Sequence, residues 1–150
     1  MRVLVQRVSS ASVSVGGAVV GAIRPEHQGL LALVGVTHTD TDADADRLAD
    51  KLWGLRILEG ERSAADVGAP LLVISQFTLY ADCRKGRRPS FTDAGNPDWA
   101  RPMFDYFVKM VDESCAVSVS SGIFGADMAV RLCNWGPVTI WLDSANLFAS

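Results

Sequence analysis

Residues 2–23, RVLVQRVSSASVSVGGAVVGAI, decide the fold class more than any other stretch of the 150-residue chain. Valines alternate or cluster through residues 2–8 and 11–15, which end at Gly16-Gly17, and a further apolar run covers Ala18 to Ile23. A Gly-Gly pair between two runs of β-branched residues is typical of a tight antiparallel hairpin. The chain is therefore predicted to open with strands joined by a short turn.

A buried strand and a helix follow the hairpin. The run LLALVGV after Gly29 is short and continuously apolar, which suits a strand buried on both faces. Asp40-Thr41-Asp42 then offers side chains that can cap a helix, and leucines recur at helical spacing from Leu48 to Leu55. This pattern predicts a first helix that ends near residue 58.

A second helix is predicted to begin at Asn96-Pro97. Asparagine caps helices well, and proline is tolerated at the first helical position. Trp99, Met103 and Met110 then belong to an apolar stripe that would face the core.

The remaining segments predict loops and strands. Residues 59–70 are polar and contain glycine, which predicts a loop. Residues 71–80, LLVISQFTLY, predict a strand whose second half turns polar, and residues 81–97 form a long irregular link. Three closing strands are predicted from the runs AVSVS (116–120), ADMAVRLC (126–133) and PVTIWLD (137–143).

This order of elements predicts an α+β fold. Strands joined by tight turns, with only two inserted helices, favour a mainly antiparallel sheet over a doubly wound parallel one. We expect a rolled or barrel-like sheet with the two helices packed on it, and a single domain over residues 1–150.

The composition fits a globular domain and disfavours several function classes. Hydrophobic residues make up 49% of the chain and charged residues 21%, so disorder is not expected. A net charge of −3 argues against a general electrostatic binder of nucleic acids, so any nucleic-acid contact needs a local basic patch. No apolar run nears the roughly 18 residues of a membrane span, so no membrane contact is expected. The 3 cysteines form no CxxC pair, which favours a reducing compartment and a cytoplasmic protein.

Motifs for metals and cofactors are missing from the sequence. The histidines, His27 and His38, show neither HExxH nor Cys/His spacing, so no metal site is expected. The sequence also lacks GxGxxG, GxxxxGK[ST] and GxSxG. Neither a nucleotide cofactor nor a nucleophile elbow therefore has support, and no cofactor is expected.

Two polar motifs lie beside predicted strands. Ser75-Gln76-Phe77-Thr78-Leu79 closes an apolar run, and Asn134-Trp135-Gly136-Pro137-Val138-Thr139 lies between two predicted strands. Strand-end hydroxyls often only satisfy backbone groups, but with backbone N–H groups they can also bind a ligand carbonyl. Gly-Pro in strand sequence is either a turn or a bare piece of backbone aimed at a pocket. From the motifs alone, both interpretations stay open.

Taken together, the two motifs resemble the D-aminoacyl-tRNA deacylase family. Shorter matches follow in the same order over nearly the whole chain: Gln6-Arg7-Val8, RPSF at 88–91, DYF at 105–107 and GIFGADM at 122–128. The resemblance implies the fold of that family and a homodimer. It also implies hydrolysis of the ester that joins a D-amino acid, or glycine, to the 3′-terminal adenosine of tRNA, with L-aminoacyl-tRNA spared.

The resemblance assigns the chiral filter to Gly136 and Pro137. In that family the Gly-Pro bond is cis and reaches into the active site of the partner subunit, where its carbonyl oxygens block an L side chain. Arg7 resembles the arginine that holds this element in place, although a strand-face ion pair is the other interpretation of Arg7. A rigid backbone wall can reject an enantiomer that hydrophobic fit alone would discriminate only weakly.

The resemblance also assigns the substrate pocket. Phe124 and Met128 match positions that line the adenosine pocket, although core residues would look alike in sequence. The family chemistry relies on the 2′-hydroxyl of the tRNA itself, without a metal or a triad. The positions beside the aminoacyl ester are Ser75, Gln76, Phe77 and Thr78.

A basic cluster, CRKGRRPSF at 83–91, lies in the predicted link. Its cations are Arg84, Lys85, Arg87 and Arg88. Such a run is often only a solvated loop. In an acidic chain it also provides a local site for tRNA phosphates.

One departure from the family pattern and three rival functions remain. Many relatives carry a longer loop with a Met-Asn element where this chain has EGERSAADV (59–67). A non-catalytic tRNA-binding module would not need the Ser75–Leu79 motif. A deacylase that prefers L-aminoacyl esters would require a trans Gly-Pro and would usually depart from that motif. A plain esterase is disfavoured because this sequence shows no nucleophile elbow or triad.

Overall fold

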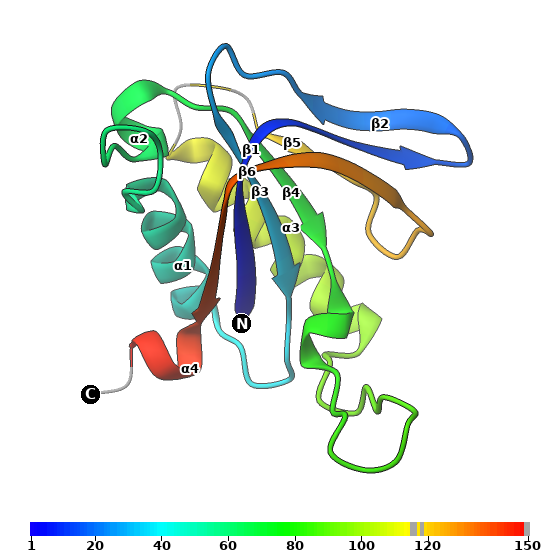
Figure 1. The fold of residues 1–150 in the computed structure, drawn as a ribbon. Coiled ribbons are helices and arrows are strands. Elements are labelled where there is room, and N and C mark those ends of the chain that lie inside the picture. Colours follow the sequence, from blue (N-terminus) through cyan, green and yellow to red (C-terminus); the bar gives the residue numbers. More distant parts are fainter. Residues whose placement is uncertain (115–116, 118, 149–150) are drawn as a thin grey trace.

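The structure is a computed structural model that describes residues 1–114, 117 and 119–148 (Figure 1). In that part of the chain six strands form one sheet: β1 (Arg2–Val15), β2 (Ala18–Ile23), β3 (Gly29–Gly35), β4 (Leu71–Ser75), β5 (Ser120–Ser121) and β6 (Ala129–Asp143). The helices of the same residues are α1 (Asp42–Gly54), α2 (Ala64–Val67), the 3-10 turn η1 (Phe77–Tyr80), α3 (Pro97–Glu113) and α4 (Ser144–Leu147).

β1 is the central strand of the sheet. Its first half pairs with β3, its second half pairs with β2, and β6 pairs with β1 from Arg2 to Ser14. These pairings are antiparallel, whereas β3 pairs with β4, and β4 with β5, in parallel. The predicted α+β class and rolled sheet are confirmed, and the two parallel pairings make the sheet a mixed one.

The predicted hairpin is confirmed. Gly16 and Gly17 have φ angles of 57° and 83°, and Val15 pairs with Ala18 across the turn. Both central residues therefore adopt the left-handed conformation that a two-residue hairpin turn requires and that glycine adopts at little cost.

Apolar side chains are buried on both faces of the sheet. On one face, Leu30 and Val34 of β3 pack into the same core as α1 and α3. On the other face, Leu31 packs with residues of β4 and of the far half of β1, including Val13. Figure 1 shows β2 and the far halves of β1 and β6 curling together at one end of the sheet. The prediction that β3 is buried on both faces is confirmed.

The two long helices begin at the predicted caps. Thr41 forms a capping box with Asp44 at α1, and Asn96 caps α3 with Pro97 at its first position. α1 ends at Gly54 rather than near residue 58, since the backbone becomes extended at Leu55.

Two segment predictions were wrong in the middle of the chain. Residues 59–70 contain α2, which a capping box between Ser63 and Asp66 stabilises, and α4 is a further short helix near the end. The strand predicted over residues 71–80 ends at Ser75. β3 also ends there, so residues after Gln76 have no strand partner and fold into η1 instead.

The closing strands also differ from the prediction. Residues 126–133 and 137–143 belong to one strand, β6, because β1 offers a partner along its whole length. Asn134 pairs with Val8 and Thr139 with Gln6, so residues 135–138 lie opposite Arg7 alone. The Gly-Pro pair therefore lies in a bulge, where proline removes no ladder hydrogen bond. Of the strand predicted over residues 116–120, residues 116 and 118 lie outside the described residues, and of the rest only Ser120 belongs to a strand, β5.

The core between α3 and the sheet allows a direct test of the packing. Phe107 is fully buried there, whereas Lys109 on the same helix points to solvent and forms only an exposed ion pair with Glu113 at 3.8 Å. Phe107→Ala should lower the free energy of unfolding by about 3–5 kcal/mol, because it removes a large buried ring. Lys109→Ala should change it by less than about 1 kcal/mol. Urea unfolding at one protein concentration measures both, and equal effects would contradict this packing.

Candidate active site

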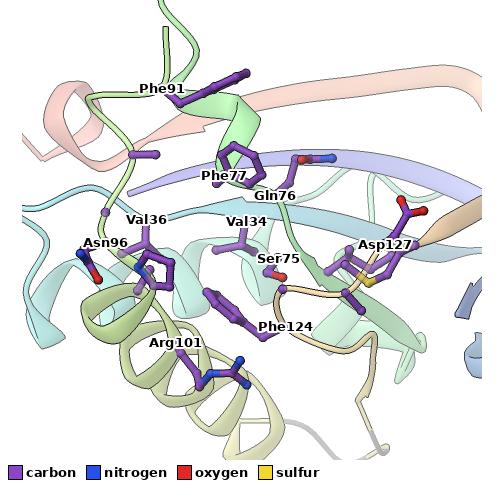
Figure 2. A pocket seen from close by; sticks show the side chains of 18 of the residues that line it. Val34, Val36, Ser75, Gln76, Phe77, Phe91, Asn96, Arg101, Phe124 and Asp127 are labelled. Atoms are coloured by element: carbon purple, nitrogen blue, oxygen red, sulfur yellow. The ribbon is translucent and has the colours of Figure 1, made fainter.

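One cavity of about 810 Å³ lies where β3 and β4 end, beside the first turns of α3 (Figure 2). The segment that precedes β6 closes another side of it. The lining residues that carry polar or aromatic side chains are Ser75, Gln76, Phe77, Phe91, Asn96, Arg101, Phe124 and Asp127. The fold thus brings together side chains from distant parts of the sequence.

The Ser75–Leu79 motif forms the edge of this cavity. The backbone N–H of Gln76 donates to the carbonyl of Val34 at 2.8 Å, and the chain then turns into η1. The amides of Phe77 and Thr78 open this turn, and the first amides of a helical turn have no partner within it. The Thr78 hydroxyl donates to Gln76 Oε1 at 2.7 Å, so Thr78 orients the glutamine and does not itself line the cavity.

Two phenylalanines form one wall of the cavity. Phe77 is 57% exposed and meets Phe91 edge to face, with ring centroids 5.1 Å apart. Figure 2 shows both rings on the side of η1, across from Phe124. Phe91 was not predicted as a site residue, although it ends the RPSF match in the sequence.

Phe124 forms the opposite wall and is held from two sides. The Arg101 guanidinium lies 4.9 Å from its ring centroid, and Phe104 contacts it with centroids 5.9 Å apart. Met128 also lines the cavity, so both predicted pocket residues do lie at this site. Sequence reasoning missed Arg101, because no motif includes it and its only signal is that it lies one turn after Pro97 on α3.

Arg2 anchors η1 to the sheet. Its guanidinium donates to the carbonyl of Leu79 at 2.8 Å and to Asp143 Oδ2 of β6 at 3.1 Å. It also lies 4.3 Å from the centroid of the Tyr80 ring. Burial, followed by the charges of Asp40 and Asp143, raises the pKa of the Tyr80 phenol, which therefore stays neutral. Sequence reasoning missed Arg2, since an arginine in a strand gives no sign of a distant partner.

The Gly136-Pro137 pair lies away from the cavity of its own chain. The peptide bond is cis, as the resemblance implied, and both residues are exposed. Arg7 donates to the carbonyl of Trp135 at 3.0 Å and to the carbonyl of Ile57 at 3.0 Å. Arg7 therefore contacts the bulge directly, and no ion pair involves it among the described residues.

The base of the bulge is closed by one amide side chain. Asn134 Nδ2 donates to the carbonyls of Arg7 and Val138, each at 3.0 Å. Gly136 has a φ of 120°, and a Cβ on it would lie 2.6 Å from an Arg7 nitrogen and 2.9 Å from the Val138 amide nitrogen. A side chain larger than hydrogen does not fit at Gly136.

The basic cluster lies on an exposed loop. The Arg84 side chain donates two hydrogen bonds to the Asp82 carboxylate, at 2.9 and 2.7 Å, and the Arg84 backbone N–H donates a third at 3.0 Å. These hydrogen bonds lower the pKa of the Asp82 carboxyl to about 2. The other cations, Lys85, Arg87 and Arg88, are exposed and have no ion-pair partner among the described residues. Of the four cations predicted to bind tRNA phosphates, Arg84 is thus already paired with a carboxylate of its own chain.

The described part of the chain holds no group of three His, Cys, Asp or Glu residues placed to bind a metal ion. Within the same residues, no helix is both long and apolar enough to cross a membrane.

Comparison with known protein families shows to which family the chain belongs. The model of the D-Tyr-tRNA(Tyr) deacylase family matches residues 4–143, which include the whole cavity and both motifs. The chain belongs to this family. It is accordingly a member of a hydrolase family rather than a non-catalytic binding module, and the resemblance seen in the motifs is confirmed.

Individual relatives agree with the assignment to the D-aminoacyl-tRNA deacylases. A protein of that name from Desulfovibrio desulfuricans is 62% identical, with all of both chains covered. One from Nocardia farcinica is also 62% identical and covers 96% of this chain and 100% of its own.

Solved structures share the fold. A structure titled c-Myc DNA Unwinding Element Binding Protein has a TM-score of 0.88 and 34% identity, covering 95% of this chain and 98% of its own. A probable eukaryotic D-amino acid tRNA deacylase has a TM-score of 0.82 at 17% identity, covering 94% and 97%, and supports the fold alone.

Proposed function

We propose that this protein hydrolyses the ester bond of D-aminoacyl-tRNA in the cytoplasm, releasing the free D-amino acid and tRNA. Glycyl-tRNA is the second substrate, because glycine has no side chain for a chiral wall to reject. One observation supports the proposal most directly: the same cavity of this deacylase-family chain is lined by Ser75, Gln76, Phe77 and Phe124.

The cavity offers two distinct environments for the substrate. Phe124 and Met128 provide an apolar wall for the terminal adenine ring, and the Arg101 guanidinium packs against the Phe124 ring. Across the cavity, the Ser75 hydroxyl, the Gln76 side chain and the amide of Phe77 would face the aminoacyl ester. Donors at this place would stabilise the negative charge that develops on the ester carbonyl oxygen.

The protein offers positioning rather than a nucleophile. The Thr78 hydroxyl is bonded to Gln76, and neither histidine lines the cavity. The 2′-hydroxyl of the terminal adenosine, adjacent to the ester, therefore assists the attack of water. Such an arrangement needs no metal ion and no other cofactor.

The chiral filter requires a second subunit. Gly136 and Pro137 are exposed at a distance from their own cavity, and the neighbouring Trp135 and Trp141 are 55% and 47% exposed on the same edge strand, β6. Two exposed tryptophans on a strand edge favour burial against a second copy of the chain. In such a homodimer each bulge would supply the wall of the partner's cavity.

The basic loop provides the contact with the body of the tRNA. Lys85, Arg87 and Arg88 carry free cations beside Phe91, which lines the cavity. These cations would bind phosphates next to the acceptor end, while Arg84 keeps Asp82 from repelling them. DNA is not a proposed partner, since it carries no aminoacyl ester.

The filter is tested by comparing hydrolysis of D-Tyr-tRNA and L-Tyr-tRNA with chelator present. The D-ester alone should be cleaved, and Gly136→Ala should slow this by about 100-fold, since a displaced wall misplaces the substrate. Gly54→Ala is the matched control, because a Cβ there meets nothing within 4 Å. Equal cleavage of both esters would overturn the proposal in favour of a general esterase.

The chemistry is tested with tRNA that ends in 2′-deoxyadenosine. If the 2′-hydroxyl assists, the D-ester of this tRNA should be cleaved about 100-fold or more slowly, in line with the loss of a positioned proton-transfer group. Affinity for the tRNA, measured with uncleaved analogue, should change little. Full cleavage of the deoxy substrate would show that a protein group does the work instead.

The dimer is tested by analytical ultracentrifugation. The purified protein should sediment with twice the 16.1 kDa mass of one chain. Trp141→Lys, which introduces a charge on the exposed edge, should shift it toward one chain and reduce hydrolysis in parallel. A fully active monomer would contradict the shared cavity.

A further inference from the structure

A second cavity, of about 330 Å³, lies on the three strands at the curled end of the sheet. It is lined by residues of β1, β2 and β6, which pair side by side there (Figure 1). Nothing in the proposed reaction uses it. The polar residues that line it are Ser10, Ser12, Arg24, Arg131 and Cys133.

The strand register puts these side chains on one face. Ser12 pairs with Ala22 of β2 and with Arg131 of β6, and Ser10 pairs with Cys133. Directly paired residues project to the same face of a sheet, and neighbours along a strand project to opposite faces. Ala11 and Val13 are buried on the inner face, so the serines and Arg131 lie on the outer one.

The two arginines flank the serines from opposite sides. Arg131 belongs to β6 and Arg24 directly follows β2, with β1 between them. Neighbouring strands are about 4.8 Å apart, so strands on either side of β1 are about 10 Å apart. An arginine side chain spans more than half of that distance. Both guanidinium groups can therefore reach a small ligand that lies on Ser10 and Ser12.

The cavity has an excess of positive charge. Its lining contains two guanidinium groups and no carboxylate. Among the described residues, neither Arg24 nor Arg131 has an ion-pair or hydrogen-bond partner, unlike Arg2 and Arg84. This is unusual in a chain with a net charge of −3, where carboxylates outnumber the cations.

We propose that this second cavity binds a phosphate group. Guanidinium groups present paired N–H donors that match phosphate oxygens, and serine hydroxyls supply further donors. The phosphate could belong to the backbone of a bound tRNA or to free inorganic phosphate, which share this chemistry. Only the first source rests on the proposed deacylase function.

The second cavity is separate from the reaction cavity. Val130 lines the reaction cavity, whereas its neighbour Arg131 lines the second one, on the opposite face of β6. Loss of the arginines should therefore leave the rate of ester cleavage at saturating D-Tyr-tRNA unchanged. This separates a failure of the phosphate site from a failure of the deacylase proposal.

The test uses an Arg24→Gln/Arg131→Gln double variant and a charge-matched control, Lys51→Gln/Lys109→Gln. The control removes two exposed cations from α1 and α3, away from both cavities. Inorganic phosphate is titrated into the full-length protein while backbone amide NMR shifts are recorded. Saturable shifts at Ser10, Ser12 and Arg131, absent from the double variant and kept in the control, are the expected result.

The source of the phosphate is decided with uncharged tRNA. If the tRNA supplies it, the slope of log affinity against log salt should fall by about 1 for each arginine lost, relative to the control. Phosphate shifts without a change in that slope would assign the site to free phosphate. No saturable phosphate shifts, together with an unchanged tRNA slope, would overturn the proposal.

Discussion

The structure depends on β1 being hydrogen-bonded on both of its edges. β3 and β2 share one edge in succession, while β6 follows the other edge almost from end to end. A strand paired on both sides cannot shift its register without breaking two ladders. Side chains on β1 therefore have well-defined positions, and two of them, Arg2 and Arg7, reach the Ser75–Leu79 motif and the Gly136-Pro137 bulge.

These arginines connect the motifs to the sheet in the same physical way. Arg2 donates to a carbonyl of η1, and Arg7 donates to a carbonyl of the Gly-Pro bulge. In both cases a charged donor binds the backbone of a segment that has left the strand ladder, and such hydrogen bonds are stronger than neutral ones. Irregular segments can thus be held at defined positions without strand pairing.

The sequence predicted what depends on neighbouring residues. The Gly16-Gly17 turn, the Thr41 and Asn96 caps and the doubly buried β3 all follow from local chemistry. The end of β4 at Ser75, the continuity of β6 and the role of Arg2 depend on partners far away in the chain. These could not be predicted from local patterns, because the same residues would suit a longer strand or a solvated arginine.

At the candidate site, too, some residues could be predicted from local motifs and others depend on contacts that are distant in the sequence. The motifs marked Gln76, Phe77 and Phe124 through resemblance, whereas Phe91 and Arg101 enter the cavity only because the loop and α3 fold against the strand ends. Thr78 shows the reverse, since its place in the motif suggested a substrate contact but its hydroxyl binds Gln76. A motif identifies the neighbourhood of a site, while the contacts decide what each member does.

The glycine at position 136 is required by the backbone of the bulge itself, independently of any substrate. Its positive φ and the closeness of the Val138 amide nitrogen would exclude a side chain even if no substrate approached. The bulge therefore needs glycine for its own backbone, and a wall without a Cβ follows as a consequence. Arg7 completes the argument, because it occupies the space where a Cβ would project and fixes the neighbouring carbonyl. A backbone segment held this way has a defined position before any ligand arrives, which is the property that the proposed discrimination between two enantiomers requires.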